Sequence, residues 1–502
     1  MLALWSIASP LFSGPDEPAH VTKAAGAARG QLNGPVRTGL GPDDPCVRGV
    51  DGPTTSATSC TYYRVPAIFL QSYQVPICYK FQPTVTADCA APFAGSKDEV
   101  LVPSTAGNYP PLYYVVTGLP SLLASSVVGV YLMRFMGVVV GAGLLAMAVT
   151  SVSRLPGRVG AAVGLAVATS PMTLFVSSVV NPSGLEVCAA IALWAGGLEV
   201  LGADGRGRGW ALARTAIAAS CLAAARPISA LWVVLIGATL VLLARRQELV
   251  AVARSRGAGL TVGAITGSTV FASIWYLVAA PTSGSSGTGV AADVSRLDIL
   301  GASLGLTSDR AVQMIGRFGW LDTWVPTVTV MVWAGAVGAL VLAGLLFGSW
   351  RQRLAVVWLV ALLVIVPPVI ESLQAHRVGF FWQGRYLLPL AVGLPIVAGH
   401  TGLRKVLRSL GPAAPGVSTM LLAALLVGHL AAFAAALDRY SFGEGSFFGD
   451  VAWSPPLVSP EVCVALYAVA LAALGWALRP LLAMPVEAPT AQAKQRNGRP
   501  PL

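Results

Sequence analysis

The sequence predicts an all-α polytopic membrane protein. Of its 502 residues, 55% are hydrophobic and only 11% are charged, and the mean hydropathy is +0.70. Soluble domains carry about a quarter charged residues, so this composition excludes an ordinary soluble domain. The apolar residues are grouped in long segments, and basic residues are concentrated between alternate segments. Both patterns are typical of a protein that crosses a membrane many times.

Eight apolar segments have the length that a hydrocarbon core of about 30 Å requires. Residues 211–244 are too long for one span, and Arg226 and Pro227 interrupt them, so two short helices are expected there because proline removes a backbone donor. Residues 386–402 form another short span, and residues 1–12 are expected to be a truncated first helix. The total is about twelve spans, of which the eight long ones lie at 131–151, 159–180, 183–201, 258–280, 326–348, 354–370, 416–437 and 460–478.

The basic residues orient these spans. Cytoplasmic connections carry an excess of Lys and Arg, and 18 of the 33 basic residues fall between alternate spans or in the C-terminal tail. We therefore expect a multi-pass plasma-membrane protein with both termini in the cytoplasm, a membrane domain over residues 111–480 and a disordered tail over 481–502. The net charge of +11 then reflects topology in the lipid bilayer and indicates no nucleic-acid partner.

Residues 13–110 are expected to form a large first extracytoplasmic loop, because they carry seven basic and eight acidic residues. This loop holds four of the seven cysteines, Cys46, Cys60, Cys78 and Cys89. An oxidising compartment allows two disulfides in three possible pairings, and we favour neighbours in sequence, Cys46 with Cys60 and Cys78 with Cys89. The wide spacing argues against the alternative of a zinc site. Further outside loops are expected near 281–325, 371–385 and 438–459.

The motif GPDEPAH, which starts at Gly14, is the sharpest candidate for chemistry. Two adjacent carboxylates, Asp16 and Glu17, lie between two prolines, and His20 follows closely. Asp16 is suited to act as a general base, Glu17 to bind a metal or orient a hydroxyl, and His20 to hydrogen-bond either carboxylate. The structural alternative is a helix cap or a turn.

Five motifs occur in order along the chain: GPDEPAH (14–20), NYPPLYY (108–114), NPSGLE (181–186), RFGWLDTWVP (317–326) and QGRYLLP (383–389). Through them the chain resembles actinobacterial members of the domain of unknown function 2142 family. More broadly, it resembles the GT-C superfamily of polyprenyl-phosphate-sugar glycosyltransferases. The resemblance implies a GT-C-like fold, a donor sugar on a polyprenyl phosphate in the outer leaflet, and a site with a base and phosphate-binding cations at the outer boundary.

Arginine suits phosphate, because its rigid fork of donors matches phosphate oxygens. Within this resemblance, Arg385 is the first candidate for a donor phosphate ligand, together with the flanking residues Gln383 and Tyr386; the alternative is an arginine that extends to the interface. Arg226 occupies the expected helix break, where free backbone groups line cavities. Arg134 is expected to pair with Asp16 or Glu17, either at the site or as a structural ion pair.

Glu186 and Ser183 fit a capping box, so a structural role is preferred to catalysis for Glu186. Some of the other candidates have a simpler alternative: an interfacial aromatic belt for the aromatic residues and an exposed rim for the pair just before QGRY. The candidates for the substrate-lining wall are Tyr109, Asn181, Trp320, Asp322, His376 and Arg377.

These residues favour a membrane glycosyltransferase that transfers a sugar with inversion from a polyprenyl phosphate to an envelope glycan, lipid or protein, with Asp16 as the base. No cofactor is required, although a divalent metal is compatible with the carboxylates. The sequence has no P-loop and no H-E-x-x-H or C-x-x-C motif. Two rivals remain: a transporter or flippase for lipid-linked saccharides, and a non-catalytic scaffold for envelope assembly.

Overall fold

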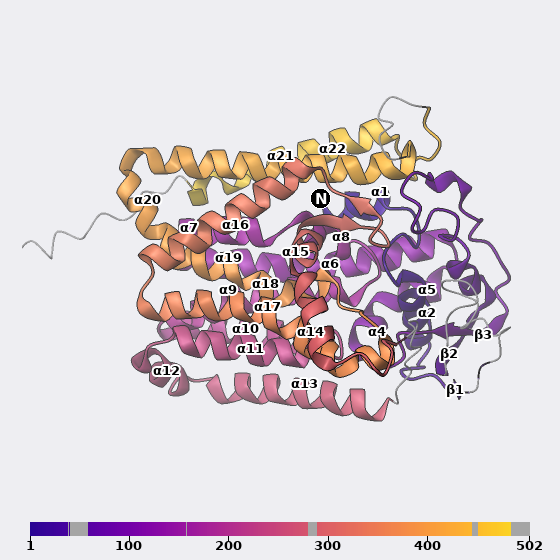
Figure 1. Ribbon diagram of the computed structural model, residues 1–502, viewed down its shortest axis with the longest axis horizontal. Helices are drawn as coiled ribbons and strands as arrows, with labels where there is room; N and C mark the ends of the chain where they lie inside the picture. Colours follow the sequence, from indigo (N-terminus) through magenta and orange to yellow (C-terminus); the bar gives the residue numbers. More distant parts are fainter. Residues whose placement is uncertain (39, 41–58, 157, 280–288, 444–449, 483–502) are drawn as a thin grey trace, which may run out of the picture.

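The computed structural model describes residues 1–38, 40, 59–156, 158–279, 289–443 and 450–482. Its long helices lie side by side along the longest axis of the molecule (Figure 1). The all-α membrane prediction is confirmed, since seven helices within the described residues are long and apolar enough to cross a membrane. They are α6 (Val127–Ser153), α9 (Pro182–Gly202), α13 (Ala258–Val278), α16 (Thr327–Phe347), α17 (Trp350–Val378), α21 (Ala414–Ser441) and α22 (Pro460–Leu482).

Helix α9 is the most enclosed of the long helices, since 94% of its apolar stretch is buried. Shorter helices complete the bundle. These shorter helices are α1 (Leu2–Ala8), α7 (Arg158–Ala168), α8 (Pro171–Val176), α10 (Gly205–Ala223), α11 (Ser229–Leu243), α18 (Gly384–Ala391) and α19 (Gly393–Ala398). The expected break at Arg226 is confirmed, because Arg226 lies in the turn between α10 and α11.

Two of the expected spans differ from the structure. The single span expected at 159–180 is wrong, because the chain leaves α7 at Ala168 and starts α8 at Pro171, with Ser170 accepting a hydrogen bond from Thr173 N as the cap. Proline fits the first turn of a helix, where its missing N–H has no partner to lose.

The span expected at 354–370 is longer in the structure. Helix α17 continues to Val378 through Pro367 and Pro368, so the first part of the loop expected at 371–385 is helical. Neighbouring helices support such prolines inside membrane helices.

The segment expected to be the first outside loop contains helix α2 (Glu17–Ala28) and a three-stranded antiparallel sheet in the order β1-β2-β3. The strands are β1 (Val36–Thr38), β2 (Ser59–Pro66) and β3 (Glu99–Ser104), and the short helices η1 (Ala67–Tyr73), η2 (Ala87–Cys89), α4 (Leu112–Gly118) and α5 (Pro120–Leu123) adjoin them. In Figure 1, α2 and this sheet lie at one end of the molecule, opposite α12 (Arg246–Ala253) and α20 (Arg404–Leu410).

The described part of the segment expected to be the second outside loop, residues 289–325, contains two helices. It holds α14 (Arg296–Gly305), α15 (Thr307–Gly316) and a small hairpin of β4 (Arg317–Phe318) and β5 (Thr323–Trp324). Helix α14 packs along α17, and α15 packs against α18 and α8. Helix α15 therefore covers the start of α18.

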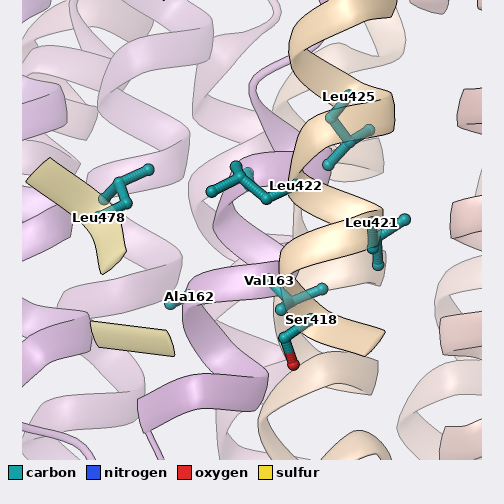
Figure 2. Close-up of a pocket in the computed structure, with 8 residues that line it drawn as sticks. Ala162, Val163, Ser418, Leu421, Leu422, Leu425 and Leu478 are labelled. Carbon is teal, nitrogen blue, oxygen red and sulfur yellow. The ribbon is translucent and has the colours of Figure 1, made fainter. Parts of the chain in front are cut away.

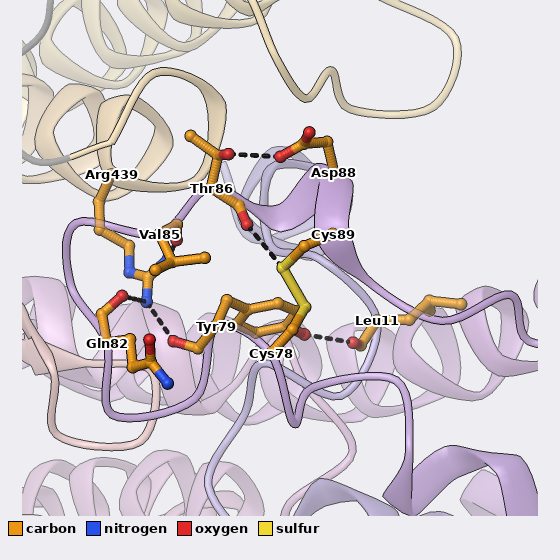
Figure 3. Close-up of a disulfide and its surroundings, with 9 residues drawn as sticks. All are labelled: Leu11, Cys78, Tyr79, Gln82, Val85, Thr86, Asp88, Cys89 and Arg439. Atoms are coloured by element: carbon orange, nitrogen blue, oxygen red, sulfur yellow. Dashed lines mark hydrogen bonds between the residues drawn. A yellow bond between two sulfur atoms is a disulfide. The ribbon is translucent and has the colours of Figure 1, made fainter.

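Cys78 and Cys89 form a disulfide, one of the two favoured pairings (Figure 3). Cys60 is also disulfide-bonded, whereas Cys46 lies outside the described residues. Beside the bridge, Arg439 of α21 donates from its guanidinium to the carbonyl oxygens of Tyr79, Gln82 and Val85 at 2.7, 3.0 and 2.7 Å. The disulfide-closed loop is thus fastened to a long helix of the bundle.

Candidate functional site

The GPDEPAH motif forms a tight turn that starts helix α2. Asp16 is the N-cap and has a φ of +60°, in the left-handed region that Asp tolerates better than most residues. The side-chain amide of Asn181 donates to Pro15 O at 2.8 Å, while Asn181 Oδ1 caps α9 by accepting from Ser183 N at 2.9 Å. Asn181 is buried and holds the turn, so it is not part of an open substrate wall.

Glu17 turns away from Asp16 and binds Arg134 of α6. Its two carboxylate oxygens accept from Arg134 Nε and Nη2, both at 2.7 Å, and also from the backbone N–H groups of Gly14 and Val180. Both charged side chains are 0% exposed. The remaining Arg134 donors bind the carbonyl oxygens of Ser6, Ser9 and Pro10.

This geometry corrects two of the expected roles. Glu17 and Arg134 use all their hydrogen-bonding capacity on the protein itself, so Glu17 is no catalytic or metal-binding candidate and Arg134 no phosphate ligand. The expected pairing of Arg134 with one of the two carboxylates is present. The Arg134–Glu17 pair connects the end of α1 to the turn that holds Asp16.

Asp16 instead faces Arg385, the second residue of α18. Arg385 Nη2 donates to Asp16 Oδ2 at 2.7 Å and to the hydroxyl of Tyr386 at 3.2 Å. The Arg385 side chain is 2% exposed, whereas 47% of the Asp16 side chain stays accessible. The Nε and Nη1 atoms of Arg385 are buried and have no partner among the described residues. A buried guanidinium with N–H donors that have no partner can bind an anion.

The Asp16 carboxylate is ionised at neutral pH. Burial removes water from the carboxylate and raises its pKa, but the charge and hydrogen bond of Arg385, with a smaller effect of Arg226, outweigh this and lower the pKa of Asp16 below the usual value. An ionised carboxylate is the form that accepts a proton.

Arg226 brings a second cation to the same place. It pairs with Glu186 at 3.3 Å, and its guanidinium lies 4.2 Å from the ring centre of Tyr386 and 5.8 Å from that of Tyr109. The capping box expected at Glu186 is wrong, because Asn181 caps α9 and Glu186 accepts from Ser229 Oγ at 2.6 Å. Glu186 compensates part of the Arg226 charge.

His20 closes the group on the side of α2. Its Nδ1 lies 2.9 Å from the Tyr114 hydroxyl, and its ring meets the Tyr109 ring edge to face at 5.4 Å. Burial lowers the pKa of His20 to about 3, with Asp16 opposing and Arg385 and Arg226 reinforcing the shift. His20 is therefore neutral at physiological pH, and it contributes hydrogen bonding and ring contacts to the site.

The structure thus brings together side chains from four distant parts of the chain. We call this group the site ring: Asp16, His20, Tyr109, Arg226, Arg385 and Tyr386. Gln383 precedes it as the N-cap of α18 and is half-buried.

Two other pairs of candidates lie elsewhere. Trp320 Nε1 donates to Phe12 O at 3.2 Å, and Asp322 accepts from Phe81 N at 2.9 Å, so both fasten the β4–β5 hairpin to neighbouring loops. His376 and Arg377 are exposed in the last turn of α17, as the rim alternative expects.

One buried network was not expected from the sequence. Glu371 of α17 is fully buried and accepts from Arg310 Nη2 at 2.7 Å and from the backbone N–H of Trp382 at 2.8 Å. Trp382 lies three residues before Arg385, so this network fixes the entry to α18. The only sequence signal was an acidic residue next to a long apolar segment.

An apolar cavity of about 340 Å³ adjoins the same helix. Leu388 and Ala391 of α18 line it together with Met314 and Trp333. Leu388 follows Arg385 by about one helical turn, a rise of roughly 4.5 Å. The unused Arg385 donors and an apolar pocket therefore occupy neighbouring turns of one helix.

A second cavity, of about 20 Å³, lies between α7, α21 and α22 (Figure 2). Its labelled wall is aliphatic except for Ser418, so it offers no chemistry. Within the residues that the structure describes, no three His, Cys, Asp or Glu side chains are grouped closely enough to hold a metal ion.

The helix lengths and composition define a multi-pass membrane protein. The chain belongs to the DUF2142 family, whose model is described as a predicted membrane protein and matches residues 1–394. This confirms the family resemblance of the five motifs. No curated protein sequence matches the chain. Two similar solved structures are crystal structures of ArnT from Cupriavidus metallidurans, in the apo state and bound to undecaprenyl phosphate; each is 15% identical, covers 96% of this chain and 75% of that chain, and has a TM-score of 0.40.

Proposed function

We propose that this protein is a GT-C-type membrane glycosyltransferase. In this proposal it transfers a sugar from a polyprenyl phosphate to an envelope glycan, lipid or protein on the extracytoplasmic side. The observation that carries the proposal is the contact between Asp16 and Arg385. A base candidate lies 2.7 Å from a buried guanidinium, two nitrogens of which have no partner in the part of the chain that the structure describes. A proton acceptor beside an anion site is what transfer from a sugar phosphate requires.

Phosphate binding and base activation are linked in this arrangement. In the ligand-free protein, Arg385 lowers the pKa of Asp16 and makes it a weaker base. A donor phosphate at Arg385 shares the guanidinium charge and adds negative charge nearby, so the carboxylate becomes more basic when the donor is bound. The base is therefore strongest in the complex that reacts.

The proposed step is one inverting displacement. Asp16 takes the proton of the acceptor hydroxyl, and the hydroxyl oxygen forms a bond to the anomeric carbon. The bond from that carbon to the phosphate oxygen breaks, and its electron pair leaves with the polyprenyl phosphate. Arg385, with Arg226 beside it, stabilises the charge on the departing phosphate. No metal ligand is assigned to this step.

The apolar cavity beside α18 supports a lipid-linked donor over a soluble one. Its lining is almost entirely hydrocarbon, and Leu388 brings it within about one helical turn of Arg385. A phosphate at Arg385 therefore has room nearby for the first isoprene units of its tail, whose burial contributes about 25 cal/mol per Å² of apolar area.

The test uses the purified full chain in lipid vesicles with a panel of polyprenyl-phosphate sugars and envelope acceptors. Sugar transfer with an inverted anomeric centre supports the proposal. Movement of the intact lipid-linked sugar across the vesicle without transfer would favour the transporter. Neither activity, with donor and acceptor both bound, would favour the scaffold.

A further inference from the structure

Lys23 is a fully buried cation that the proposed chemistry does not use. Its side chain is 0% exposed, and its ammonium donates to the carbonyl oxygens of Ala106, Gly107 and Tyr109 at 2.9, 2.8 and 2.5 Å. Three donors thus meet three acceptors, which leaves none unused. The ring centre of Tyr114 lies 4.8 Å away. Among the described residues, no ion pair involves Lys23.

Burial lowers the pKa of Lys23 well below its usual value, because desolvating an ion costs several kcal/mol. Three carbonyl acceptors match the three donors of the protonated form. A buried ammonium is nevertheless an energetically unfavourable way to connect two segments of chain. A hydrogen bond between uncharged groups already connects the same segment to α2, because the Ser104 hydroxyl donates to Ala19 O at 2.8 Å. The Lys23 ammonium differs from this neutral contact because one nitrogen binds three carbonyl oxygens and so fixes the curved backbone of residues 106–109. The last residue of this backbone segment is Tyr109, a member of the site ring.

Helix α2 places Lys23 and His20 three residues apart, on one face of the helix. His20 contacts the Tyr109 ring from one side, and Arg226 faces that ring at 5.8 Å. The backbone of Tyr109 is held by Lys23 and its ring by these two neighbours. Tyr109 is only partly buried between these neighbours, so with the donor phosphate at Arg385 the accessible part of the Tyr109 side chain is left for the sugar.

We propose that Lys23 is a positioning residue which, through the Ala106–Tyr109 carbonyls, holds Tyr109 as the wall that contacts the donor sugar. This inference rests on the proposed function, because it assumes a phosphate-linked sugar in the site ring. A merely structural lysine would affect folding and all ligands alike. A positioning lysine affects the recognition of the sugar and leaves recognition of the phosphate intact.

The experiment compares the affinities of two kinds of ligand in detergent: undecaprenyl phosphate, and the tightest-binding member of a panel of polyprenyl-phosphate sugars. For Lys23→Met we expect about tenfold weaker binding of the sugar-linked ligand and binding of undecaprenyl phosphate within about twofold of wild type. Tyr109→Ala should produce the same split. The double variant should lose no more than the worse single variant, because both changes act on one element.

The matched control is Tyr73→Phe, which removes the hydrogen bond from the Tyr73 hydroxyl to Pro103 O at 2.7 Å, just before the segment that Lys23 binds. Both affinities should stay within about twofold of wild type. Lys23→Gln, which keeps an N–H donor, replaces Lys23→Met if the latter does not fold.

Equal loss of both ligands, unchanged binding of both, or multiplied losses in the double variant would overturn the role of Lys23. A wild-type protein that binds no polyprenyl phosphate of either kind would overturn both proposals. A wild type that binds these ligands but transfers no sugar would overturn the proposed function alone, since the affinities still decide the role of Lys23.

Discussion

The buried pair of Arg134 and Glu17 allows a quantitative test of the corrected assignment. In Arg134→Met, the Glu17 carboxylate keeps its two backbone N–H donors but loses its counter-charge. The carbonyl oxygens that Arg134 binds near α1 lose their donor as well. Removal of one partner from a fully buried ion pair costs about 3–5 kcal/mol. We expect the free energy of unfolding to fall by that amount.

The measurement is chemical denaturation of wild type and variant in the same detergent. Arg154→Met is the control, because Arg154 is 49% exposed and lies 4.0 Å from Glu199, so its loss should cost at most about 1 kcal/mol. An Arg134→Met protein as stable as the control variant, but unable to bind undecaprenyl phosphate, would refute the structural assignment and restore Arg134 as a ligand residue.

Three further predictions concern stability. Burial lowers the pKa of His20 to about 3, so between pH 6.5 and 3 the unfolded chain binds a proton at His20 that the folded protein does not. The free energy of unfolding should therefore fall by up to about 1.4 kcal/mol per pH unit as the pH decreases through that window, as measured by thermal unfolding. The variant His20→Gln should lack this contribution to the pH dependence. Replacing Cys78 and Cys89 by serine should cost about 2–3 kcal/mol in denaturant, because the bridge closes a short loop; an unchanged midpoint would contradict this. Gly118→Ala should lower the yield of folded protein, since a Cβ at this position would clash with the Ala24 carbonyl oxygen of α2. Gly143→Ala should leave the yield unchanged, because the space around Gly143 is open.

Hydropathy and proline predicted most of the bundle, because each long apolar segment has only one way to satisfy its backbone in lipid. The break at Arg226 was predictable for the same reason. The break at Pro171 was not, because the apolar segment continues through it without a charge. Pro367 and Pro368 were equally ambiguous, since proline can end a membrane helix or lie within one when its neighbours support it.

The site was predictable as a set of motifs but not as a set of contacts. Asp16 and Glu17 are adjacent and chemically alike in the sequence, yet the left-handed turn at Asp16 sends them to opposite arginines. For Glu186, the local S-x-x-E spacing predicted a cap, while its partner Arg226 lies 40 residues away in the chain. Such long-range pairings leave no local pattern in one sequence.

Sugar transfer by Asp16→Asn tests the central claim most directly. The substitution keeps the size of the side chain and removes its ability to accept the proton, and general bases contribute about 10²–10⁴ in rate. We expect kcat to fall by that factor while undecaprenyl phosphate still binds, because Arg385 remains available. Transfer at the wild-type rate by Asp16→Asn would contradict the assignment of Asp16 as the base.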